Sequence, residues 1–204
     1  LLLNRGMKDM VSKTLHQMIN GGIFDQLEYG FHRYSTDQYW EIPHFEKMLY
    51  DQAFSVILYT DAYRATGNKE FARFVDLLAK YMHGRLLSCE GGFYSSEDAD
   101  SEGEEGGYYM VTDPASILPP DLMEYAKRSM LIPFGDGYIV RGANGTAAGQ
   151  RCLELLKRSR VDKVRPKIDS KILTDWNSLA AASLAFAGSV LGRDDFVYSA
   201  KNVF

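Results

Sequence analysis

The chain has 204 residues, of which 46% are hydrophobic and 25% are charged, and its net charge at pH 7 is −4. A chain of this size can bury a substantial core, so one domain over residues 1–204 is expected. The acidic balance, without a clustered stripe of Lys and Arg, argues against nucleic acids and anionic membranes as partners.

The sequence also carries no membrane or redox signal. No apolar run approaches the roughly 20 residues that a membrane-spanning helix needs, and no signal peptide opens the chain. The two cysteines, Cys89 and Cys152, lie far apart and form no CxxC motif, so neither a zinc site nor a thioredoxin centre is predicted. These features predict a cytoplasmic protein without a metal or another cofactor.

Four stretches show helical periodicity, and they are of two alternating kinds. Residues 7–19 and 71–86 place apolar side chains at three- and four-residue spacing, which predicts helices with one buried face. Residues 45–65 and 175–191 carry such side chains around most of the helical circumference, which predicts helices covered on more than one side. A two-layer helical ring requires this alternation, with the second kind inside. The sequence therefore predicts an all-α fold, the α/α toroid.

Short glycine-containing turns are expected to close the helical hairpins. Residues 66–71 and 191–196 each contain a Gly followed four residues later by an aromatic side chain, and residues 5–10 are a weaker copy. A glycine ends a helix by adopting the left-handed conformation, and a following Asn or Asp can cap the next helix. Such self-similarity is typical of αα-hairpin repeats.

Three longer segments that are polar and rich in aromatic residues, 20–44, 90–109 and 165–177, each connect an outer helix to an inner one. In an up-and-down arrangement these connections all lie on one rim of the ring, and rims built from such loops are where functional sites usually lie. We therefore expect the side chains of the three segments to converge.

The ends of the chain and one internal region bear on the size of the ring. Residues 1–3 resemble the tail of an inner helix and residues 200–204 stop within an outer one, so we expect a piece of a longer protein and an incomplete ring. Residues 113–165 show no regular pattern, because prolines and glycines interrupt it. Periodicity predicts roughly six or seven helices, about half of a closed ring.

The polar segments resemble those of one family. The stretches concerned are 30–35 (GFHRYS), 43–51 (PHFEKMLYD), 91–104 (GGFYSSEDADSEGE) and 171–177 (KILTDWN). They are similar to the YyaL-type proteins, which are thioredoxin-domain-containing proteins related to the spermatogenesis-associated thioredoxin-like proteins. The resemblance implies an (α/α)6 toroid related to the six-hairpin glycosidases and the N-acylglucosamine 2-epimerases. It also implies a preceding thioredoxin-like domain, which this chain lacks and which would be its partner in the parent protein.

The chain departs from the family pattern at several positions. Lys167 and Ser170 stand where the family more often has a histidine and an aspartate. The stretch between Thr112 and Lys171 is also short for the family. These departures bear on whether the fragment retains activity.

Two histidines flank the first aromatic motif. His32 and His44 could act as base and acid for proton transfer beside a carbonyl, which is the task of a sugar epimerase. The alternative is that both only hydrogen-bond to neighbouring loops.

Carboxylates are more numerous in these segments than a surface rim needs. Glycoside hydrolysis uses two carboxyl groups about 5 to 10 Å apart, one protonated and one charged. Asp98 or Asp100 together with Asp25 would form that pair. For Glu46, helix capping or ion pairing with Arg33 is the favoured alternative.

An aromatic face beside a few convergent polar groups describes a small-molecule pocket. The side chains expected to bind the substrate are aromatic, amide or charged: Gln26, Arg33, Trp40, Glu46, Glu97, Asp175, Trp176 and Asn177. Packing at a helix end is the alternative role for Trp176.

Residues 97–105 contain six acids in nine residues, which raises the question of a metal site. Asp98, Asp100 and Glu102 match the first half of a calcium loop, but Tyr109 stands where the bidentate Glu should be. A solvated acidic turn is therefore favoured, and no metal site is predicted.

These observations predict a carbohydrate-active domain, either an epimerase or a glycoside hydrolase, that binds a sugar-like or other polar small molecule. The competing hypothesis is a non-catalytic scaffold that presents substrates or partners to the thioredoxin-like domain, to which any thiol chemistry would belong. Side chains that face one open cavity would favour the enzyme, and side chains engaged in mutual ion pairs would favour the scaffold.

Overall fold

The computed structural model describes residues 2–143 and 145–203. The chain divides into two compact units, each built from separated segments. Unit 1 comprises the residues up to His16, Lys47–Glu97 and the residues from Ile168 onward, and unit 2 comprises Gln17–Glu46 and Asp98–Lys167. The expected helix ends at residues 1 and 204 lie in part outside the described residues.

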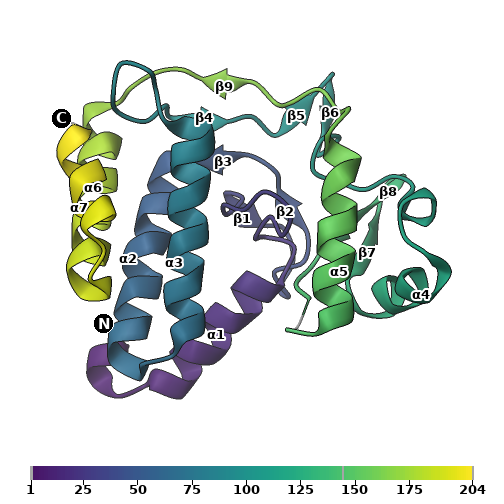
Figure 1. Ribbon diagram of the computed structural model, residues 1–204, viewed down its shortest axis with the longest axis horizontal. Coiled ribbons are helices and arrows are strands. Elements are labelled where there is room, and N and C mark those ends of the chain that lie inside the picture. Colours follow the sequence, from purple (N-terminus) through teal and green to yellow (C-terminus); the bar gives the residue numbers. More distant parts are fainter. Residues whose placement is uncertain (1, 144, 204) are drawn as a thin grey trace. The chain divides into compact units, whose positions relative to one another are not determined.

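Unit 1 is built around two helical hairpins. Helix α2 (Leu49–Thr66) is followed by α3 (Lys69–Tyr81), and α6 (Thr174–Leu191) is followed by α7 (Asp194–Asn202). Figure 1 shows these helices side by side, with α2 packed against α3 and α6, and α6 packed against α7. A short 3-10 helix, η1 (Leu3–Arg5), precedes α1 (Lys8–Asn20), which begins in unit 1 and ends in unit 2.

The two hairpin turns follow most of the predicted chemistry. Gly67 adopts φ = 70° at the end of α2, and the Asn68 side chain caps α3 by accepting the N–H of Glu70 at 3.0 Å. Gly192 adopts φ = 68° at the end of α6. In this second turn the expected Asp cap is wrong, because Arg193 occupies the N-cap and the aspartates lie inside the first helical turn, where they favour the helix dipole.

The helices of unit 1 differ in sequence more than they differ in burial. Helix α3 buries one face that includes Phe71, Val75 and Leu78, and α2 and α6 also bury one broad face each. The expected all-round burial of α2 is therefore wrong, because its Phe54 and Leu58 are exposed. The described residues contain seven α-helices, four of them paired in unit 1 as the hairpins α2–α3 and α6–α7, which agrees with the predicted helical class. One boundary differs, because the helix expected over residues 71–86 ends at Tyr81 and continues as a π-helical turn, η2 (Met82–Leu86).

A three-stranded sheet joins the polar connections in unit 1. Its antiparallel strands are β3 (Lys47–Met48), β4 (Ser96–Glu97) and β9 (Ile168–Asp169), in the order β3-β4-β9. Strand β3 follows the first polar connection directly, and β4 and β9 lie within the other two. The second and third polar connections therefore pair with each other at this sheet, beside the strand that follows the first connection.

Unit 2 includes the region in which the sequence showed no pattern. Two helices, α4 (Pro120–Ser129) and α5 (Ala147–Leu156), accompany the antiparallel hairpin of β7 (Leu131–Phe134) and β8 (Gly137–Val140). The 3-10 helices η3 (Pro114–Ser116) and η4 (Lys157–Arg160) precede α4 and follow α5. The sequence predicted only helices, so the β7–β8 hairpin is a departure from that prediction. Pro133 within β7 and Gly135 after it left no regular pattern from which the strands could be predicted.

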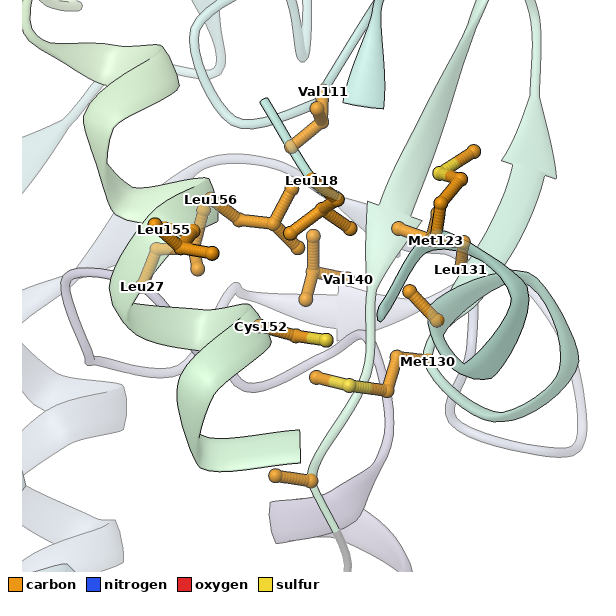
Figure 2. Packing of buried hydrophobic residues seen from close by; sticks show 12 residues of the cluster. Leu27, Val111, Leu118, Met123, Met130, Leu131, Val140, Cys152, Leu155 and Leu156 are labelled. Carbon is orange, nitrogen blue, oxygen red and sulfur yellow. The ribbon is translucent and has the colours of Figure 1, made fainter. Parts of the chain in front are cut away.

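The apolar core of unit 2 involves both helices and the β7–β8 hairpin. Figure 2 shows Leu156 and Cys152 of α5 directed toward Leu118 and Val140, and all four side chains are buried. Since η4 follows α5 directly, this core fixes the position of Arg160 at the end of η4.

Within the described residues, no helix combines the length and the apolar character needed to span a membrane.

Candidate functional site

A partly exposed histidine in unit 2 lies on a short antiparallel ladder. Strand β1 (Tyr34–Ser35) pairs with β2 (Pro43–His44), and the register sets Tyr34 directly opposite His44. Directly opposed residues on one face of a ladder approach closely. The two rings accordingly stack, with centroids 5.0 Å apart and an interplanar angle of 23°.

Two carboxylates approach the two ring nitrogens of His44. Its Nδ1 donates to Glu105 Oε1 at 2.7 Å, and its Nε2 lies 3.8 Å from Glu46 Oε2. Glu46 also accepts a hydrogen bond from Arg33 Nη1 at 3.1 Å. The His44 side chain is 28% exposed, so a ligand can reach it. We call Arg33, Tyr34, His44, Glu46 and Glu105 the His44 cluster.

The arrangement suits proton transfer. A carboxylate at Nδ1 fixes the tautomer of the imidazole and leaves Nε2 to accept or donate the mobile proton. His44 Nε2 lies 3.8 Å from Glu46 Oε2, which is longer than hydrogen-bond distance, so these two groups form no hydrogen bond with each other.

A tight hairpin delivers Glu105 to this cluster. Strand β5 (Asp100–Ser101) pairs with β6 (Glu104–Glu105), and Asp100 lies opposite Glu105. The two turn residues, Glu102 and Gly103, have φ of 55° and 86°, as a type I′ turn requires. The acidic segment is therefore a hairpin, and the described residues contain no group of three His, Cys, Asp or Glu side chains that could hold a metal ion.

Asp98 and Asp100, the candidate hydrolytic carboxylates of this segment, are exposed. Asp98 Oδ1 accepts the N–H of Asp100 at 3.3 Å, and the Asp98 N–H donates to Lys167 O at 2.8 Å. Their carboxylates are accessible to a ligand, in contrast to that of Asp25.

Asp25 is buried, and both of its oxygens are engaged. Oδ1 accepts the N–H groups of Leu27 and Glu28 at 3.0 and 3.3 Å, and Oδ2 accepts Arg160 Nη1 at 2.7 Å. Arg160 Nη2 also donates to Tyr109 O at 2.9 Å. Burial alone would lower the pKa of Arg160, but Asp25 and Glu28 raise it above its usual value. In this geometry Asp25 anchors the loop that follows α1.

Glu28 extends this network. It accepts the Tyr108 hydroxyl at 2.5 Å and Arg165 Nη2 at 2.8 Å, and Arg160 Nη1 lies 3.8 Å away. Burial would raise the pKa of Glu28, but the hydrogen bond from Tyr108 and the two arginines together lower it. Burial, and then the bond to Glu28, raise the pKa of Tyr108.

His32 is buried beside this network. Its Nδ1 donates to Phe45 O at 2.7 Å, and its ring meets those of Phe45 and Tyr109 edge to face at 5.3 and 4.9 Å. Asp25, His32 and Arg160 border a cavity of about 10 Å³. This volume admits about one water molecule and is far smaller than the pocket that a sugar needs.

Gln26 and Trp40 shape the same loop. The Gln26 amide donates to Ile19 O at 2.8 Å and to the carbonyls of Gly21 and Phe24 at 3.2 Å. Trp40 has φ = 65°, and its carbonyl accepts the N–H of Ile23 at 3.1 Å.

Four predicted binding residues belong to unit 1. Glu97 is buried and accepts hydrogen bonds from Tyr81 Oη at 2.9 Å and from Arg85 Nε at 3.1 Å. Asn177 exchanges hydrogen bonds with the backbone of Phe93, at 2.6 and 2.9 Å.

Of the other two, Asp175 is exposed and Trp176 meets Tyr50 edge to face, with ring centroids 4.8 Å apart. Within unit 1, therefore, Glu97 and Asn177 hold the three-stranded sheet region together, and Asp175 remains accessible to solvent.

Sequence reasoning missed two partners. Glu105 was recognised only as part of an acidic run, although Glu102-Gly103 as a two-residue turn would have paired Asp100 with Glu105. The role of Arg160 could not be predicted, because residues 113–165 show no regular sequence pattern and its partner Asp25 is 135 positions away.

Comparisons with known proteins identify homologues. No protein-family model matches the chain. It is 32% identical over 241 aligned residues to human "Spermatogenesis-associated protein 20", with 96% of this chain and 31% of that protein covered. The rat protein of the same name is 34% identical, with 96% and 30% covered. The aligned region is longer than this chain, so the relatives carry residues within it that the chain lacks.

Two solved structures are also similar to the chain at low scores. A D-mannose isomerase has a TM-score of 0.36 and 12% identity, covering 95% of this chain and 50% of that one. A cellobiose 2-epimerase from Bacillus thermoamylovorans has a TM-score of 0.34 and 12% identity, with 89% and 64% covered. Likenesses at these scores carry no conclusion about the reaction.

The chain spans less than a third of the curated relatives' length, and over 96% of its own length it is homologous to spermatogenesis-associated protein 20.

Proposed function

We propose that this chain is a carbohydrate-active domain that binds a sugar-like or other polar small molecule at the His44 cluster and moves a proton there. The observation that carries the proposal is a partly exposed imidazole with a carboxylate hydrogen-bonded to Nδ1 and a second one near Nε2. An aromatic ring stacked beside it, that of Tyr34, suits the apolar face of a sugar ring.

Epimerisation is the reaction that this arrangement suits best. Nε2 of neutral His44 removes a proton from the carbon beside the sugar's carbonyl group, and Glu105 stabilises the imidazolium through Nδ1. The proton is returned to the opposite face of the same carbon by a second acid or by water. Arg33 lies beside Glu46 and can donate to a sugar hydroxyl.

Glycoside hydrolysis is the second form of the proposal. Asp98 and Asp100 are accessible carboxylates of the same unit, whereas Asp25 is held by Arg160. The hydrolytic form therefore relies on Asp98 or Asp100 paired with a carboxylate of the His44 cluster.

A specific observation favours a scaffold as the alternative function. Asp25 pairs with Arg160 and Glu97 pairs with Arg85, so two of the proposed site carboxylates are engaged in ion pairs. On this alternative the domain presents substrates or partners to a thioredoxin-like domain of the same parent protein. The motif resemblance to YyaL-type proteins supports such a parent, for which a cytoplasmic location is part of the proposal.

Deuterium exchange tests the enzyme directly. The chain is incubated with aldoses and ketoses in D2O, and NMR follows deuterium entering the carbon beside the carbonyl group. We expect exchange with at least one sugar, and we expect His44→Ala to slow it by about 100-fold, the contribution typical of a general base.

His16→Ala is the matched control, because His16 is a partly buried histidine of unit 1 with its Nε2 2.9 Å from Glu70. Exchange that survives in His44→Ala would remove the His44 cluster from the mechanism. No exchange and no sugar-dependent rise in melting temperature, in a folded protein, would favour the scaffold.

A further inference from the structure

Unit 1 contains a groove that the His44 cluster does not use. It has a volume of about 670 Å³ and is bordered by the end of α3, the π turn η2 and helix α7. Small-molecule sites commonly measure about 300 to 1,000 Å³. The walls include apolar Leu87, Phe196 and Tyr198, and the polar groups include His83 and Ser199.

The hydrogen bonds of His83 define which of its nitrogens is the base. Nδ1 lies 2.7 Å from Ala79 O, and because a carbonyl oxygen only accepts, Nδ1 must carry the hydrogen. In neutral His83 the other nitrogen, Nε2, is therefore an acceptor. Ser199 Oγ is hydrogen-bonded to that Nε2, so the serine hydroxyl donates its proton to the imidazole.

Local structure holds both side chains in place. His83 lies in the π turn Met82–Leu86, and π turns within helices occur frequently at functional sites. Its ring rests edge to face on Phe93, with centroids 5.5 Å apart. Helix α7 is tied to α3 through Arg193, which pairs with Asp76. Ser199 is thus the hydroxyl, His83 is the base, and the Ala79 carbonyl orients the base. This is the arrangement of an activated nucleophile.

We propose that Ser199 is a nucleophile activated by His83 and that the groove takes a carboxylic ester. Ser199 Oγ attacks the ester carbonyl carbon while His83 Nε2 takes the hydroxyl proton. The bond to the alcohol oxygen then breaks, and the alcohol leaves with that proton, which gives an acyl-serine. Water, deprotonated by His83, cleaves the acyl-serine to the acid and restores both side chains.

The groove has the lining that such a substrate needs. Leu87 and Tyr198 are exposed and offer apolar surface for an acyl group, with buried Phe196 beneath them. Lys80 and Arg193 border the same groove, with Arg193 in ion pairs with Asp76 and Asp195, so the polar part of the lining carries charges of both signs. The proposal rests on unit 1 alone, so its failure would leave the proposed function of the His44 cluster untouched.

A fluorophosphonate probe tests the nucleophile, because it labels serines activated by a histidine. We expect mass spectrometry of the labelled full chain to place the adduct on Ser199, and not on Ser189, an exposed serine of the neighbouring α6. In His83→Gln the labelling should slow by about 100-fold, the usual contribution of a general base. Labelling of Ser199 no faster than that of Ser189, in the unmodified chain, would overturn the proposal.

A second variant gives an independent readout. In Ser199→Cys the introduced thiol should react with iodoacetamide faster than Cys89, an exposed cysteine of the same unit, because a neighbouring imidazole favours the thiolate. The excess should disappear in the double variant with His83→Gln. Equal alkylation rates of the two thiols, in a protein with unchanged circular dichroism, would show that the His83–Ser199 hydrogen bond has only a structural role. That result would refute the proposal.

Discussion

Asp25 is a candidate catalyst by sequence and an anchor by geometry, and its substitution separates the two roles. Its carboxylate is the nearer counterion of buried Arg160, so Asp25→Asn leaves that cation with only Glu28, 3.8 Å away, among the carboxylates that pair with it. We expect a loss of about 3 to 5 kcal/mol in the free energy of unfolding, measured by urea denaturation. Asp98→Asn, at an exposed position, should change it by less than about 0.5 kcal/mol. Similar losses in the two variants would show that the Arg160 pair does not stabilise the fold.

Glu28 should make the free energy of unfolding depend on pH in the acidic range. Its pKa in the folded protein is lowered from an ordinary value of 4.5, so its stabilising contribution is full above that value and is lost as the pH falls through the folded pKa. The free energy of unfolding should therefore decrease below about pH 4.5, and less steeply in Glu28→Gln. Glu154→Gln is the control, since Glu154 is exposed and pairs with Arg151 on the surface of α5. If the free energy of unfolding depends on pH in Glu28→Gln as it does in the unmodified chain, Glu28 does not stabilise the fold through its ionised form.

The α2–α3 turn gives a prediction for a single element. Gly67 has φ = 70° and open space around the position of a Cβ, so Gly67→Ala introduces backbone strain without a steric clash. The left-handed conformation costs a non-glycine residue about 1 to 2 kcal/mol, and we expect that loss in thermal unfolding. Gly84→Ala is matched, because Gly84 also has open space but no positive φ, and it should be neutral or slightly stabilising. Equal effects would mean that the turn is not rigid.

Elements with strong local signals could be predicted, and those set by distant contacts could not. The helices follow from apolar spacing, and the capping of α3 follows from Gly67-Asn68. The β7–β8 hairpin and the π turn at His83 had no such signal, because four-residue strands and one extra residue in a helix leave little periodicity.

At the scale of the whole molecule, the sequence motifs predicted which residues are candidates for the site, but not the burial or the partners of their side chains. Asp25 and His44 belong to the same polar connection, yet one is buried and held by Arg160 and the other is partly exposed and held by Glu105. Both partners come from segments more than sixty positions away, so no local pattern could separate the two roles. The sequence could therefore predict which segments form the site, but not which side chains remain accessible in it.

The discontinuous units also predict that sequence halves do not fold separately. A fragment of residues 1–97 retains α2 and α3 but lacks α6, the helix that packs against α2 and buries Ala180, Leu184 and Ala187. Fully burying one leucine side chain contributes about 1.5 to 3 kcal/mol, so losing this helix removes a large part of a marginal stability.

We expect the 1–97 fragment to show weak helical circular dichroism and no cooperative thermal transition, whereas the full chain melts cooperatively. Adding residues 168–204 as a separate peptide should restore helical signal, because these residues supply α6 and α7 to the same unit. A matched peptide with Leu184→Asp should fail to do so, since it places a charge at a buried position of α6. A fragment that melts cooperatively without the peptide would show that the α2–α3 hairpin is stable without α6.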